Sequence, residues 1–212
     1  MTARNESQTP EVRRLAALLL RQCLDRKLTV EEAIAGSPQA ALLDARDRAL
    51  LSTLLLTSFR HRGEIDAVLR KLLDKPLPRR SGGARDILAI GVAQLLFLAM
   101  PAHAVIDLAV RSAKADRNAL HFSGLVNAVL RKVAAEAGTL LTDLDAPHLN
   151  TPDWLWARWS KNYGEEGARR IAQAQAERPG LDISFRETPS DWQATLGGSI
   201  LANGQVRIPP DH

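Results

Sequence analysis

The fold is decided by the stretch ARDILAIGVAQLLFLAM, which occupies residues 84–100. Beyond its first turn this stretch is apolar on nearly every side of a helical projection, a pattern typical of a helix buried all round. Pro101 follows directly, and proline cannot continue a helix. The run is interrupted by Gly91 and Gln94 and is shorter than the roughly 20 residues that a membrane span requires. We therefore predict a buried central helix at residues 87–100 and no membrane insertion.

Amphipathic helices are predicted on both sides of this central segment. Gly63 lies between two apolar sets and is expected to mark a bend, because glycine weakens a helix interior. Thr29 is expected to cap one short helix, which residues 36–38 would end. In the last helix, Leu125 falls on the buried stripe and Asn127 is expected to be a buried amide bonded to backbone. The apolar spacing of one helical face recurs in these segments, which together predict a mainly α-helical bundle: residues 12–23, 30–35, 45–59, 65–73, 104–114 and 123–135.

The sparse cysteines and histidines exclude several classes of site. Cys23 is the single cysteine and falls on the buried stripe of the first helix. Intrachain disulfides and cysteine-based zinc sites are therefore excluded, and a reducing, cytoplasmic setting is expected. The five histidines are scattered, and the sequence contains neither a glycine-rich phosphate loop nor a serine in a strand-to-helix elbow. We assign no catalytic, cofactor-binding or metal-binding residue within this chain.

The net charge of +4 conceals an asymmetry along the chain. Residues 1–138 contain 21 lysines and arginines against 14 aspartates and glutamates, whereas residues 139–212 contain 7 against 10. Excess positive charge on one domain attracts polyanions, so nucleic acid is the leading partner class. A solvated basic surface is the alternative for any single residue. The candidate RNA-binding residues lie on predicted outer helical faces or in a basic, proline-rich and glycine-rich loop: Arg13, Arg14, Arg21, Arg60, Arg62, Lys75, Arg79, Arg80, Arg85, Arg131 and Lys132.

After Gly138 the sequence changes character. Thr151 and Pro152 form a typical helix start, with threonine as the cap and proline at the first helical position. Three of the four tryptophans follow closely, at positions 154, 156 and 159. We expect this helix to bury aromatic surface at a junction between modules, with stacking on RNA bases as the alternative.

The last part of the chain predicts the start of a small α+β unit. A second helix is expected at residues 165–175, and the period-two alternation at residues 181–185 predicts a strand. Thr188 and Pro189 offer a further helix start. Asn203 and Gly204 form a tight-turn signal before a last strand at residues 205–208. The predicted organisation is a helical domain, a tryptophan-rich helical linker and the start of an α+β subdomain: residues 1–138, 139–180 and 181–212.

Two stretches of the helical part resemble the NusB fold, namely residues 84–110 and FSGLVNAVLRK at residues 122–132. The most specific marks are PAHA at residues 101–104 and GLVNAVLR at residues 124–131. The resemblance continues through PDWLW at residues 152–156 and the helix after Tyr163 and Gly164. These look like the linker between the NusB-like domain and the catalytic portion in RsmB/Sun-type ribosomal RNA cytosine-C5 methyltransferases. The resemblance weakens after Leu181.

This resemblance implies a non-catalytic, RNA-binding N-terminal region that positions ribosomal RNA for a methyltransferase domain of the same protein. The family's S-adenosylmethionine-binding sheet, its glycine-rich cofactor loop and its two catalytic cysteines would lie beyond His212. We therefore expect the chain to be the front part of a longer enzyme, with no cofactor in the chain itself. One alternative is a NusB-type antitermination adaptor that binds RNA together with a partner protein. Another is a structural domain that covers apolar surface of a catalytic domain, and the oligomeric state stays open.

Overall fold

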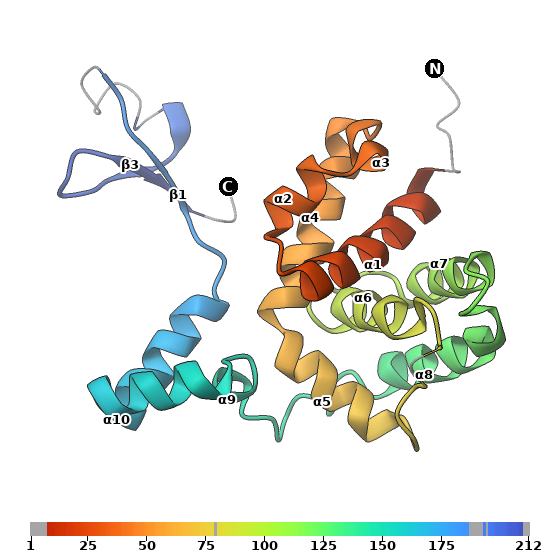
Figure 1. Ribbon diagram of the computed structural model, residues 1–212. Helices are drawn as coiled ribbons and strands as arrows, with labels where there is room; N and C mark the ends of the chain where they lie inside the picture. Colours follow the sequence, from red (N-terminus) through yellow and green to blue (C-terminus); the bar gives the residue numbers. More distant parts are fainter. Residues whose placement is uncertain (1–7, 79, 187–192, 194, 210–212) are drawn as a thin grey trace.

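The computed structural model describes residues 8–78, 80–186, 193 and 195–209. Most of the described residues form a helical domain, on the right in Figure 1. Its elements are α1 (Gln8–Arg26), α2 (Val30–Ala35), α3 (Pro38–Ala41), α4 (Ala45–Arg60), α5 (Arg62–Leu72), α6 (Ala84–Leu96), α7 (Ala102–Ala115), a 3-10 turn (Leu120–Phe122) and α8 (Ser123–Ala135).

An extension follows this domain and lies beside it, on the left in Figure 1. It consists of α9 (Ala146–Leu149), α10 (Asp153–Ala176), β1 (Leu181–Ile183), β2 (Ser199–Ile200) and β3 (Val206–Ile208). The strands form an antiparallel sheet in the order β1-β3-β2. The predicted mainly α-helical bundle with a small α+β unit is thus confirmed.

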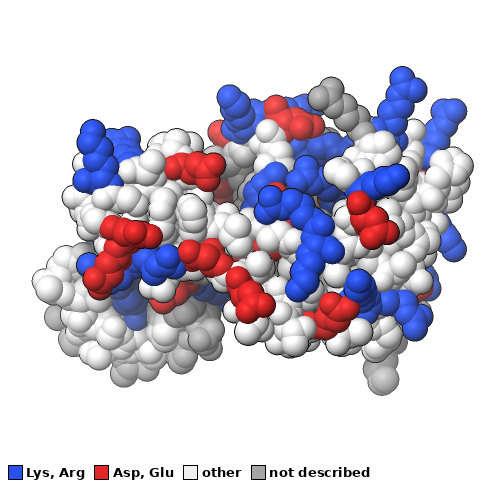
Figure 2. All heavy atoms as spheres, turned by 90° about the horizontal axis from the view of Figure 1, so that it is seen from below, with Lys and Arg blue, Asp and Glu red and all other residues white. Residues whose placement is uncertain are grey.

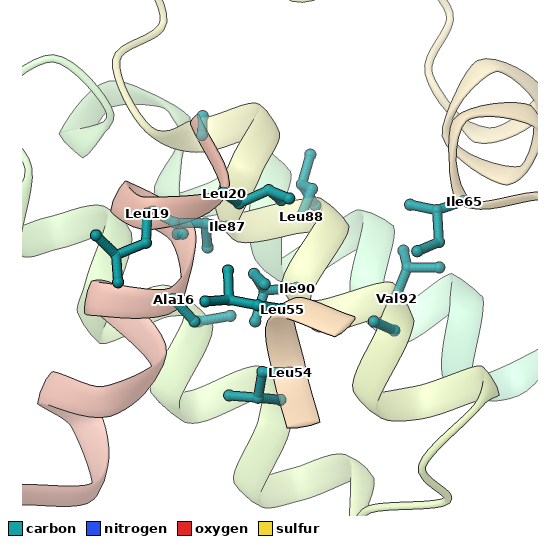
Figure 3. Packing of buried hydrophobic residues seen from close by; sticks show 14 of the residues in the cluster. Ala16, Leu19, Leu20, Leu54, Leu55, Ile65, Ile87, Leu88, Ile90 and Val92 are labelled. Carbon is teal, nitrogen blue, oxygen red and sulfur yellow. The ribbon is translucent and has the colours of Figure 1, made fainter. Parts of the chain in front are cut away.

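Helix α6 occupies the centre of the helical domain, as its all-round apolar sequence predicts. It packs against α1, α4, α5, α7 and α8, and its side chains interlock with those of α1 and α4 in Figure 3. Leu88, Val92 and Ala93 are fully buried. Gly91 lets α8 come close, because a Cβ at this position would lie 2.7 Å from a methyl carbon of Leu130. Close packing of this kind leaves no room for an added methyl group.

The central helix ends earlier than the sequence predicts. It stops at Leu96 and not at Met100, because Ala99 takes the left-handed conformation with φ 47°. The backbone N–H of Met100 then donates to the carbonyl of Gln94 over 3.1 Å. This bond satisfies one of the last helical carbonyls and turns the chain before Pro101.

Several further details of the predicted bundle need correction. Ser37 and Pro38 do not simply end a helix; Ser37 caps α3, and its hydroxyl accepts from the backbone N–H of Ala40. Leu125 is 37% exposed and so lies outside the buried stripe of α8. Asn127 is half-buried, and no described residue bonds its amide. Cys23 is buried as expected.

The extension also differs from its prediction in part. The two expected helices are both present within α10, and they meet at a kink at Gly164, where φ is 74°. Trp154 is 67% exposed, which contradicts the expectation that this helix buries its aromatic side chains. The predicted turn is confirmed, because Gly204 takes φ 79° between β2 and β3. The first strand ends at Ile183, and the helix start expected at residues 188–189 lies outside the described residues.

The extension is attached to the helical domain where α9 meets the first turn of α5. Gly63 lies in that turn, and a Cβ there would come within 1.8 Å of the Leu149 carbonyl oxygen. The expected bend lies at His61 instead, between α4 and α5, where φ is −107°. Glycine is therefore required at position 63 so that the backbone of α9 can approach α5.

A buried carboxylate fixes the same contact. Glu64 is 6% exposed, and its Oε2 accepts from Asn150 Nδ2 over 2.7 Å, while its backbone N–H donates to Asn150 Oδ1 over 3.1 Å. His61 Nδ1 lies 2.8 Å from the same Oε2, and its ring stacks on Phe97 with centroids 3.8 Å apart. Burial raises the pKa of Glu64, but the hydrogen bonds from His61 and Asn150 outweigh it, so the pKa lies below its ordinary value. We call Gly63, Glu64, Leu149 and Asn150 the joint.

We expect Gly63→Ala to destabilise the chain by roughly 1–3 kcal/mol, because the added methyl group must displace the backbone of α9. Urea unfolding followed by circular dichroism measures this change. Gly124→Ala is the matched control, since nothing lies within 4 Å of a Cβ there. That variant should be neutral or up to about 1 kcal/mol more stable. Equal effects of the two substitutions would contradict the close approach at Gly63.

We expect Glu64→Gln to lower stability at neutral pH by about 1–2 kcal/mol, because the charge that His61 and Asn150 stabilise is lost. The folded-state pKa of Glu64 is lowered, so its contribution is complete above the unfolded value of about 4.3 and disappears as the pH falls through the folded value. The difference from the parent chain should therefore shrink below about pH 4. Urea midpoints from pH 3 to pH 7 test this. The control Glu165→Gln replaces an exposed carboxylate and should have nearly the stability of the parent chain at every pH. A loss of stability in Glu64→Gln that does not change with pH would contradict the lowered pKa of Glu64.

Candidate nucleic-acid interface

Two of the predicted RNA-binding arginines are used within the helical domain. Arg13 is half-buried, and its Nε donates to Gln94 Oε1 over 2.6 Å; burial lowers the pKa of Arg13. Arg21 forms an ion pair with Asp86 at 2.7 Å and also donates to the carbonyl of Gly82. Burial raises the pKa of Asp86, and the contacts with Arg21 offset this only in part. Both arginines hold α1 against α6, so their charge is already used within the helical domain.

Two further predicted residues gather around one carboxylate beside the joint. Asp66 on α5 pairs with Arg85 at 3.1 Å and with Arg62 at 3.8 Å. Arg70, which the sequence analysis did not single out, donates its Nε to the backbone carbonyl of Asp66 over 3.3 Å. Two guanidinium groups therefore share a single negative charge, and a third contacts the backbone of the same residue. Their local excess of positive charge favours an anion such as phosphate.

These arginines border a cleft between the helical domain and the extension, which we call the junction cleft. One wall comes from α5 and residues 73–77, and the other from α9 and the first residue of α10. Arg70 and Arg85 line the first wall, and His148 lines the second. The joint lies at its base, since Gly63 and Leu149 also line it. The orientation of α9 therefore determines the width of a cleft that carries both charges, with Arg70 and Arg85 lining it alongside Asp66, Asp74 and Asp153.

A second group lies where α7 packs on α8. Arg131 lines a shallow hollow there together with His103, Ile106 and Asn127. Lys132, the next residue, is exposed. In the described part of the chain, no carboxylate lies within ion-pair distance of Arg131 or Lys132. These two charges are available to a partner.

The remaining predicted residues are spread over the surface. Arg14, Lys75 and Arg80 are exposed, and Arg60 is half-buried at the end of α4. None of these four forms an ion pair with another described residue. Arg79 lies outside the described residues. The predicted cations thus do not form one continuous face.

Figure 2 shows the basic character of the helical domain from below, where blue side chains predominate over red ones on the right. The sequence analysis missed several exposed cations of this domain. All of these cations are exposed, and they lie on α5, on α7 or just after α7: Arg70, Lys71, Arg111, Lys114 and Arg117. Their spacing opposite the apolar stripes would have identified them, since charged residues occupy the outer face of an amphipathic helix.

The described residues offer no centre for catalysis or metal binding. No group of three or more metal-ligating side chains occurs among them. Burial raises the pKa of the Cys23 thiol, and its Sγ contacts the Thr29 carbonyl at 3.7 Å, so this cysteine is a poor nucleophile. No described helix is both long and apolar enough to cross a membrane.

Comparison with known proteins shows which families and relatives the chain resembles. The model of the NusB family matches residues 10–135. The chain is 32% identical over 187 residues to "Ribosomal RNA small subunit methyltransferase B" of Pasteurella multocida, a match that covers 87% of the chain and 41% of that protein. The proteins of that name from Xanthomonas campestris and Sodalis glossinidius are 32% and 31% identical, over 72% and 90% of the chain and 34% and 44% of their own lengths.

The matches to these relatives continue beyond the NusB-like residues. The alignments with the Pasteurella and Sodalis proteins span 187 and 201 residues, more than residues 10–135 contain, so they include part of the extension. The chain spans less than half the length of these curated relatives. With a helical domain that the family model matches nearly end to end, the chain belongs to the NusB family.

Proposed function

We propose that the chain is the RNA-docking region of a ribosomal RNA cytosine-C5 methyltransferase, and that it holds ribosomal RNA for a catalytic domain of the same protein. The observation that carries this proposal is the similarity to small-subunit ribosomal RNA methyltransferases, which includes the extension as well as the NusB-like domain. A free-standing NusB-like domain would need no such extension. We expect the protein to act in the cytoplasm.

The electrostatics of the helical domain support the same proposal. Arg131 and Lys132, together with the arginines around Asp66, offer charge to RNA phosphates. Phosphate contacts of this kind position a nucleic acid without reading its sequence. Recognition of a particular cytosine would then depend on the catalytic domain and on the shape of the RNA.

S-adenosylmethionine would supply the methyl group in the catalytic domain. The described residues do not suit this cofactor, because neither Gly82 and Gly83 nor Gly197 and Gly198 join a strand to a helix as a cofactor-binding glycine loop does. We therefore assign binding of RNA, and no step of methyl transfer, to this chain.

The NusB-type antitermination adaptor is not favoured. Relatives of such an adaptor would be expected to match the NusB-like residues alone. The relatives found for this chain are named methyltransferases, and their alignments include the extension as well. A structural domain that only covers a catalytic domain would not need exposed cations without partners, such as Arg131 and Lys132. RNA titrations separate RNA docking from a purely structural role, whereas a pull-down that recovers transcription factors but no ribosomal RNA would favour the adaptor.

We expect the chain to bind a ribosomal RNA fragment with an affinity that falls steeply between about 50 and about 200 mM salt, because phosphate contacts release counterions. Replacing both Arg131 and Lys132 by Gln should lower the slope of log K against log salt by about 1–2. Fluorescence anisotropy with a labelled fragment measures both quantities. The control is Arg170→Gln, which removes a cation that is paired with Glu166 at 2.6 Å. Binding that is absent, or insensitive to salt, would overturn the proposal.

In the full-length enzyme, the same Arg131→Gln and Lys132→Gln substitutions should raise KM for ribosomal RNA several-fold and leave kcat nearly unchanged. Docking contacts are made equally in the ground state and the transition state, so their loss weakens binding without slowing the chemical step. Steady-state methylation assays give the two constants. A fall in kcat at unchanged KM would instead assign these residues to the catalytic step.

A further inference from the structure

The first half of α10 presents an aromatic side chain and two cations on one outer face. Trp154, Arg158 and Lys161 are spaced four and three residues apart, which places them on the same side of a helix. All three are exposed, and Trp154 has 67% of its surface in contact with solvent. We call these three residues the Trp154 face.

A neighbouring tryptophan of the same helix already has partners within the chain. Trp156 packs against His148 with ring centroids 4.5 Å apart and lies under the guanidinium of Arg169 at 5.7 Å. Trp154 makes no ring or cation–π contact with any described residue, and neither Arg158 nor Lys161 pairs with a described carboxylate. Tryptophan is enriched at binding surfaces, where a partner covers its large apolar ring.

The chemistry of the Trp154 face suits unpaired RNA. Every base has a flat face that can stack on an indole ring, and flanking cations bind the phosphates on either side. The acidic average of residues 139–212 conceals this local arrangement, because Glu165 and Glu166 come only after the helix is interrupted at Gly164. The face also lies close to the junction cleft, since Asp153, directly before Trp154, lines that cleft.

We infer that the Trp154 face binds single-stranded RNA, with one base stacked on Trp154 and adjacent phosphates bound by Arg158 and Lys161. This inference rests on the proposed RNA-docking function and deepens it. RNA whose phosphates contact Arg70 and Arg85 in the junction cleft would reach the start of α10, where its unpaired end meets the indole. The extension is then an active part of the RNA-binding surface as well as a linker.

The test is an anisotropy titration of the intact chain with a labelled single-stranded RNA of about 12 nucleotides. Trp154→Ala should weaken binding about tenfold, whereas Trp154→Phe should retain most of the affinity because phenylalanine still stacks. Replacing both Arg158 and Lys161 by Gln should reduce the salt slope. Tyr163→Ala is the matched control: Tyr163 is 64% exposed on the same helix but lies nine residues on, on the opposite face. It should bind RNA like the parent chain.

The outcomes separate this inference from the function on which it rests. Unchanged binding by Trp154→Ala, with weaker binding after substitution of Arg131 and Lys132, would overturn the inference and leave the proposed function standing. Absence of RNA binding by the parent chain would overturn the proposed function itself. Sedimentation equilibrium tests the rival occupant: a dimer of the parent chain that Trp154→Ala converts to a monomer would assign the face to a second copy and contradict the inference.

Discussion

The carboxylate of Glu64 is the point on which the arrangement of the molecule depends. It is buried between α5 and α9, accepts hydrogen bonds from Asn150 and His61, and would be unfavourable there without them. His61 stacks on Phe97 at the end of α6, so the central helix supports the same network. Gly63 allows the two backbones to approach closely enough for the bonds to form. The joint therefore relates the extension to the core of the helical domain through packing and through directional hydrogen bonds.

The same geometry brings together groups that are far apart in the sequence. Because α9 is held against α5, His148 and the start of α10 face Arg70 and Arg85 across the junction cleft. Several other arginines serve the fold: Arg13 and Arg21 bind α1 to α6, and Arg169 pairs with Asp145 at 2.6 Å. The number of lysines and arginines in the sequence therefore overestimates the number that are available to bind a partner. The candidates that we propose for RNA binding are exposed cations without a described carboxylate partner, such as Arg131 and Lys132, the two arginines that share Asp66, and an exposed tryptophan.

The sequence predicted the features that depend on local patterns. The all-round apolar character of α6, the tight turn at Gly204 and the interruption of the linker helices at Gly164 could all be read from neighbouring residues. The end of α6 could not, because it is set by the left-handed conformation of Ala99. Glu64 and Asn150 are 86 positions apart, and their pairing follows from the fold and not from any motif. For the candidate site, residue type identified exposed cations such as Arg131, but which arginines would be used internally depended on long-range partners. Stacking of Trp154 on RNA is only the alternative in the sequence analysis, because the acidic average of residues 139–212 hides a short local pattern.

Photocrosslinking of the chain to a 4-thiouridine-labelled single-stranded ribosomal RNA fragment tests the central claim most directly, with mass spectrometry to locate the crosslinked peptides. We predict crosslinks on both walls of the junction cleft, in α5 with residues 73–78 and in the first half of α10, and their loss from α10 when Gly63→Ala displaces α9. Crosslinks confined to the β1-β3-β2 sheet, or an unchanged α10 pattern in the Gly63 variant, would contradict the view that the joint builds one RNA-binding surface from two parts of the chain.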